Sequence, residues 1–167
     1  MSRRWFAALL VLAPLAVPAG AAAKPPVCSP DAVRERLIDL GKLTPEGIEL
    51  GSDVDLIRCG DVTKDGDTDA LFTIASGGTA GDIRFGVLRG SSDGSAPALV
   101  LFRQGYKVGI ARRNHRSFEV IQPHYKAGEP NCCPSSFRVR RYTWRGDHFK
   151  AGKAKKRKHA AARFYRP

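Results

Sequence analysis

The chain has 167 residues, of which 43% are apolar and 26% charged, and its formal net charge is +12. This composition is that of a globular protein, and it excludes both a wholly disordered chain and a fibrous one. Once the two ends are set aside, the length suffices for one modest domain and is too short for two.

The first 23 residues have the three parts of a secretory signal peptide. Two arginines precede an apolar stretch from Trp5 to Pro18, and small residues lead to a cleavage site after Ala23. Because the stretch contains two prolines and is shorter than the roughly 20 residues of a spanning helix, we expect cleavage and not a retained membrane anchor. Cys28 follows Lys-Pro-Pro-Val and not a lipobox. We therefore expect a secreted protein without a lipid anchor.

The segment after Cys28 predicts one helix. Ser29 is a hydroxyl N-cap, and the next two residues place proline and an acid in the first turn. Apolar residues follow at helical spacing from Val33 to Leu40, and Gly41 is a suitable stop. We expect a helix over about residues 30–40.

Beyond Gly51, short apolar runs alternate with turn residues, a pattern typical of β-strands. The predicted strands cover residues 54–59, 69–75, 83–89, 98–103, 106–111, 117–123, 137–144 and 148–150. Connections this short leave no room for crossover helices, so the strands should pair antiparallel. The predicted fold class is α+β, mainly β, with one N-terminal helix packed on an antiparallel β-meander.

The segment 61–69 is an acidic loop between two predicted strands. Side-chain oxygens fall at loop positions 1, 3, 5 and 9, residue 67 offers a carbonyl at position 7, and glycine occupies position 6. The candidate ligands are Asp61, Thr63, Asp65, Asp67 and Asp69. Since Ca²⁺ takes about six to eight oxygens, this spacing predicts a calcium site. It is not an EF-hand, because Phe72 stands where a bidentate Glu is required. The alternative is an acidic hairpin that satisfies itself through Asx-turn bonds and lysines.

The four cysteines are Cys28, Cys59, Cys132 and Cys133. An even number in an exported chain predicts two disulfides, whereas a metal site would favour a Cys-x-x-Cys pair, which the sequence lacks. Adjacent Cβ vectors normally point apart, so a bond between Cys132 and Cys133 would need a distorted peptide. We therefore expect each of these two to bond a different partner, either Cys28 or Cys59.

Candidate catalytic residues are sparse. His124 and Asp147 can be paired with a serine only on paper, because no Gly-x-Ser-x-Gly elbow or similar motif accompanies them. Two structural disulfides would leave no free thiol for redox chemistry. We expect a protein that is not an enzyme.

The last 18 residues are strongly basic. Residues 150–167 contain eight Lys and Arg and no acidic residue, whereas residues 24–149 have a net charge of only +2. A segment this polar is predicted to be disordered. Its cluster attracts polyanions within a Debye length of about 8 Å, and in an exported protein these are anionic wall polymers or lipid headgroups and not specific nucleic acid. The alternative is a solubilising tail. The cluster comprises Lys153, Lys155, Lys156, Arg157 and Lys158.

The order of these features resembles a known family. A cysteine before a helix, a cysteine closing a strand, and Cys132-Cys133-Pro134 before a final strand resemble the LppP/LprE lipoproteins of actinobacteria over residues 28–149. The acidic loop resembles the calcium loops of FG-GAP and VCBS-type modules. The resemblance implies an envelope protein of undefined biochemical role and supplies no catalytic residues. The chain departs from the family in lacking a lipobox.

The sequence therefore predicts a signal peptide (1–23), one disulfide-stapled domain (24–149) and a basic disordered tail (150–167). The predicted function is that of an exported, envelope-associated domain whose tail is an electrostatic tether. The alternative is a calcium-dependent binding or adhesion module that uses the acidic loop, and an inhibitor or chaperone-like partner of another exported protein also stays open.

Overall fold

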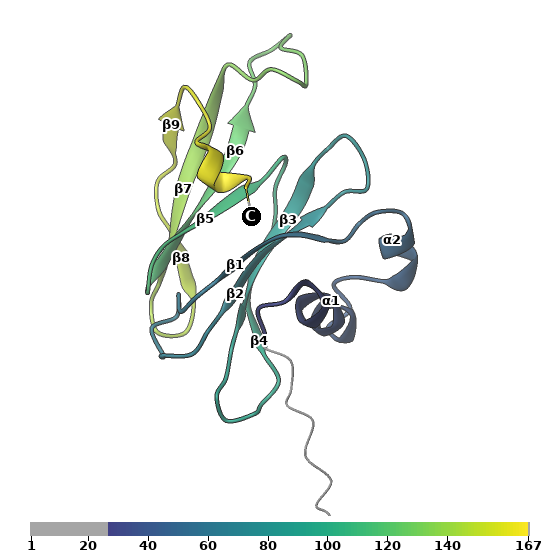
Figure 1. Ribbon diagram of the computed structural model, residues 1–167. Coiled ribbons are helices and arrows are strands. Elements are labelled where there is room, and N and C mark those ends of the chain that lie inside the picture. Colours follow the sequence, from purple (N-terminus) through teal and green to yellow (C-terminus); the bar gives the residue numbers. More distant parts are fainter. Residues whose placement is uncertain (1–26, 167) are drawn as a thin grey trace, which may run out of the picture.

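The computed structural model describes residues 27–166, so the predicted signal peptide 1–23 lies outside the described residues. These residues form two antiparallel sheets (Figure 1). The first sheet has the order β1 (Val54–Cys59), β2 (Ala70–Ala75), β3 (Asp82–Arg89) and β4 (Ala98–Gln104). The second contains β5 (Gly109–Asn114), β6 (Ser117–His124), β7 (Ser136–Trp144) and β8 (Phe149–Ala151), and β9 (Lys155–Arg157) pairs with β7. The predicted antiparallel, mainly β fold with two disulfides is confirmed.

Two helices precede the first sheet. Helix α1 (Pro30–Asp39) begins as predicted, with the Ser29 hydroxyl accepting from the Ala32 N–H at 3.2 Å. Helix α2 (Pro45–Glu49) was not predicted, although Thr44 caps it through the same Thr/Ser-Pro-acid pattern. With five residues, α2 is too short for a helical period to show in the sequence. Between residues 27 and 166, no helix combines the length and the apolar character that crossing a membrane requires.

Both faces of the first sheet are covered (Figure 1). Phe72 and Ile74 of β2 pack with α1, whereas Leu71 packs with residues of the second sheet. Because successive side chains of a strand point to opposite faces, β2 needs apolar residues on both sides. This explains why the sequence of β2 is almost continuously apolar.

The C-terminal segment is ordered, and the prediction of a disordered tail over 150–167 was wrong for the described part. The backbone of β9 pairs with β7, with Lys155 opposite Val139. A 3₁₀ helix, η1 (Ala162–Phe164), follows, and Phe164 is only 2% exposed where it packs on Ala111 and Ile121 of the second sheet. Strand pairing uses backbone groups, so β9 forms although its three side chains are exposed and basic.

The disulfides join Cys28 to Cys59 and Cys132 to Cys133. The number of bridges was predicted correctly, but the expectation that Cys132 and Cys133 would bond different partners was wrong. The first bridge ties the entry of α1 to the end of β1, and the second lies within the loop between β6 and β7.

The distance between the two regions explains this pairing. The Arg112 side chain donates to the carbonyl of Cys59, and Arg112 pairs with Phe118 at the start of β6. The loop that holds the other two cysteines follows His124, at the opposite end of β6. Six strand residues span about 20 Å, whereas a disulfide needs Cα atoms within about 7 Å. No cysteine of that loop reaches the first bridge.

Candidate functional site

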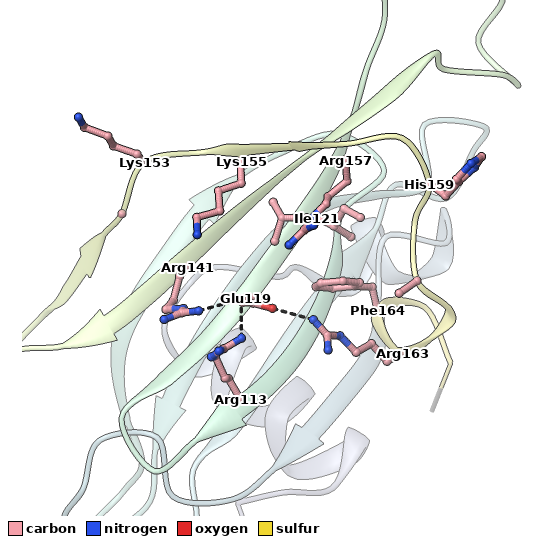
Figure 2. A pocket seen from close by; sticks show the side chains of 13 residues that line it. Arg113, Glu119, Ile121, Arg141, Lys153, Lys155, Arg157, His159, Arg163 and Phe164 are labelled. Atoms are coloured by element: carbon pink, nitrogen blue, oxygen red, sulfur yellow. Dashed lines mark hydrogen bonds and ion pairs between the residues drawn. The ribbon is translucent and has the colours of Figure 1, made fainter.

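A basic cavity of about 680 Å³ lies between the outer face of the second sheet and the C-terminal segment (Figure 2). Its walls come from β5, β6 and β7, from β9, and from the segment through η1. Six cationic side chains line it: Arg113, Arg141, Lys153, Lys155, Arg157 and Arg163.

One carboxylate lies at the centre of this basic cavity. The side chain of Glu119 is 11% exposed, and its Oε1 lies 3.2 Å from Arg113 and 3.5 Å from Arg141. Its Oε2 accepts from Arg163 at 2.8 Å, as the dashed lines in Figure 2 show. A single negative charge cannot neutralise six positive ones. The cavity therefore keeps a large positive charge, held in place by ion pairs that fix three of its arginines.

The sheet register explains how these residues meet. Glu119 on β6 lies directly opposite Ala111 on β5 and Arg141 on β7. Arg113 is two residues beyond Ala111 and therefore points to the same face. Cross-strand partners of opposite charge stabilise such a face. On β9, the same alternation brings Lys155 and Arg157 to the cavity.

The structure brings together three of the five residues predicted to bind polyanions. Lys153, Lys155 and Arg157 line the basic cavity, whereas Lys156 and Lys158 are exposed and not among its lining residues. The strand residues of the cavity and its central Glu119 were not predicted from the sequence. The signal available was the alternation of arginines along β7, which does not reveal which face is covered.

The acidic loop is organised around Asp69, which is fully buried. Its Oδ2 accepts from the Val62 N–H at 2.7 Å and from both the N–H and the hydroxyl of Thr63 at 3.0 Å, and its Oδ1 accepts from the Gly90 N–H at 3.1 Å. Burial raises the pKa of Asp69, and these donors oppose that rise. Asp69 thus anchors the loop to the sheet.

Three of the five predicted metal ligands converge. Asp61, Asp65 and Asp69 each place one carboxylate oxygen within 4.8 Å of the others, so the cluster is able to hold a metal ion. Thr63 and Asp67 take other partners, since the Thr63 hydroxyl donates to Asp69 and Asp67 accepts from the Ser92 N–H at 3.1 Å. The loop also satisfies itself locally, because Asp61 accepts from the Lys64 N–H at 2.6 Å.

No protein-family model matches the chain, and comparison with curated proteins and with solved structures returns no match. The two disulfides are consistent with an oxidising, extracytoplasmic location.

Proposed function

We propose that the protein is an exported domain that binds anionic polymers of the cell envelope through the basic cavity. The observation that carries this proposal is the gathering of six cationic side chains around one carboxylate. A concave site of one sign raises the local concentration of counter-ions, and the low dielectric of its walls strengthens the effect.

The arrangement favours phosphate or carboxylate groups. Arginine presents a planar fork of donors that matches both anions, whereas lysine acts as a point charge. The C-terminal segment acts as a wall of the site and not as a loose tether. Because its backbone is already paired with β7, binding would not have to order the chain first.

Binding of soluble polyphosphate to the full chain tests this proposal. Lys155→Gln with Arg157→Gln removes two charges from the cavity, and Arg103→Gln with Arg145→Gln removes two exposed charges elsewhere as the matched control. We expect the cavity pair to weaken binding by about tenfold, or about 1.4 kcal/mol, and the control pair to weaken it much less. If both pairs of variants weaken polyphosphate binding equally, binding depends on the net charge of the protein alone, and the basic cavity is not the binding site.

Vesicles with anionic headgroups distinguish the source of the anion. We expect the Lys155/Arg157 double variant to lose more polyphosphate binding than vesicle binding, because a flexible polymer can enter a concave site and a flat bilayer cannot. Binding should weaken between about 50 and 200 mM salt, since the interaction is electrostatic. Salt-independent binding would contradict the proposal.

We further propose that the protein acts outside the cytoplasm and is not an enzyme. The signal-peptide pattern of residues 1–23, the disulfides and the LppP/LprE resemblance all support an envelope location. Mass spectrometry of the secreted form should give an N-terminus at Lys24. An intact Met1 together with four free thiols would overturn the location.

We propose calcium binding by the acidic loop as a second function. The supporting observation is the convergence of Asp61, Asp65 and Asp69. Because Asp69 already accepts four hydrogen bonds, an ion would compete with them, so we expect weak affinity. Calorimetric titration of CaCl₂ should show binding that Asp65→Asn weakens and that Asp93→Asn, in the loop between β3 and β4, leaves unchanged. The absence of any heat or thermal stabilisation would refute it.

A further inference from the structure

A second cavity, of about 430 Å³, has the opposite character to the basic one. It lies where both sheets, the loop between β6 and β7 and the C-terminal segment meet. Its walls include the carboxylates of Asp55 and Asp82 and the rings of Tyr125, Phe137 and Tyr165.

The two carboxylates form an acidic floor. Asp82 is 8% exposed and accepts from the Thr73 hydroxyl at 2.5 Å. The Thr73 oxygen accepts in turn from the Leu56 N–H, which fixes its proton toward Asp82. Burial and the neighbouring charge of Asp55 together raise the pKa of Asp82 to about 6, and the bond from Thr73 opposes this rise. Within residues 27–166, neither carboxylate forms an ion pair with a basic side chain.

The one lysine in the lining of this cavity is held elsewhere. The Lys107 Nζ donates to the carbonyl of Asn131 at 2.6 Å and lies 5.7 Å from the centre of the Tyr106 ring. In the part of the chain that the structure describes, the acidic pair is therefore without an ion-pair partner, and a cation entering the cavity would meet two carboxylates.

The walls are aromatic, and their hydroxyls are already used. The Tyr125 hydroxyl donates to the Asn131 carbonyl at 2.7 Å, and the Tyr165 hydroxyl donates to the Lys107 carbonyl at 3.2 Å. The aromatic rings, and not the hydroxyls, are therefore the surface that the two tyrosines offer to a ligand. Burial, followed by the charge of Asp82, raises the pKa of Tyr165 to about 12, which places this ring in the field of the acidic pair.

We propose that this cavity binds an organic cation, an ammonium or guanidinium group carried on an apolar body. The carboxylates would pair with the charge, and the tyrosine and phenylalanine rings would cover the apolar part and attract the cation through their faces. A bare calcium ion fits less well, because it needs about six to eight oxygens and the cavity offers few beyond Asp55 and Asp82. This inference is independent of the anion-binding function.

Benzylammonium and benzyl alcohol are the probes, because they share a ring and differ in charge. In NMR titrations of the full chain near neutral pH, we expect benzylammonium to bind at least about tenfold more tightly and to shift the Tyr125 and Tyr165 resonances. Asp55→Asn with Asp82→Asn should abolish this preference. As the matched control, Asp31→Asn with Glu35→Gln removes two acidic groups from α1 and should leave binding unchanged.

Three results would overturn the inference. Equal binding of benzyl alcohol would make the cavity merely apolar, and unchanged binding by the Asp55/Asp82 double variant would place the probe elsewhere. Displacement of benzylammonium by an equal concentration of CaCl₂ would make the floor a metal site. Thermal unfolding of each variant verifies that a loss of binding is not a loss of fold.

Discussion

Replacing Asp82 by asparagine tests whether the protein retains a buried carboxylate at the expense of stability. The substitution keeps the size of the side chain and an oxygen that accepts from the Thr73 hydroxyl. It removes the negative charge that burial and Asp55 disfavour. We therefore expect the variant to be more stable than the natural protein near neutral pH.

The magnitude follows from the pKa of Asp82, which rises from 3.8 to about 6 on folding. Each unit corresponds to about 1.4 kcal/mol, so the group accounts for up to about 3 kcal/mol. Because the folded pKa is raised, this contribution is fully present below the unfolded pKa and is lost as the pH rises through the folded pKa. The Asp82→Asn variant does not lose this stability as the pH rises. The difference in free energy of unfolding between the variant and the natural protein should therefore grow between about pH 4 and pH 7.

Urea unfolding from about pH 4 to pH 8 measures the effect as the difference between the variant and the natural protein. Taking the difference cancels the contributions of Asp69, whose pKa burial also raises, and of Asp53, whose pKa the bond from Arg34 lowers. Glu35→Gln, on an exposed face of α1, is the control and should leave the pH profile unchanged. A variant that is less stable near neutral pH, or a difference independent of pH, would refute the reasoning.

Two further predictions concern the disulfides and the C-terminal segment. Replacing Cys28 and Cys59 by serine opens a loop with a sequence separation of 31 and should lower the free energy of unfolding by about 4 kcal/mol. The same change at Cys132 and Cys133, whose sequence separation is 1, opens no long chain loop and should lower the free energy of unfolding much less. Urea unfolding measures both changes, and equal losses of stability would contradict the prediction. Phe164→Ala removes the buried anchor of η1 and should cost about 3–5 kcal/mol, with a parallel loss of polyphosphate binding. If Phe164→Ala melts at nearly the same temperature as the natural protein, the C-terminal segment does not contribute to the stability of the fold.

The C-terminal segment lies between the two candidate sites. Arg163 and Phe164 line the basic cavity, and Tyr165 lines the acidic one. The two cavities therefore share a wall, while their opposite charges suit different ligands. Variants that dislodge this wall should affect both sites, and variants of the carboxylates or of β9 should affect only one.

The sequence alone was enough for most of the secondary structure up to residue 151, with α2 as the exception. Helix α1 and strands β1 to β8 were predicted within a few residues because caps, turns and side-chain alternation act over short distances. The acidic loop was also local, and Gly66 adopts the positive φ of 90° that its position requires. The number of disulfides followed from the even count of cysteines.

Tertiary structure alone decided the pairing of the cysteines, the order of the C-terminal segment and the location of both cavities. Glu119 meets Arg163 across 44 residues of sequence, and Asp55 faces Asp82 from another strand of the sheet. Such contacts depend on which sheet faces pack together, and the spacing of residues along the chain does not contain that information. The basic C-terminal segment folds because the backbone of β9 pairs with β7. In addition, Phe164 packs against apolar residues on the outer face of the second sheet.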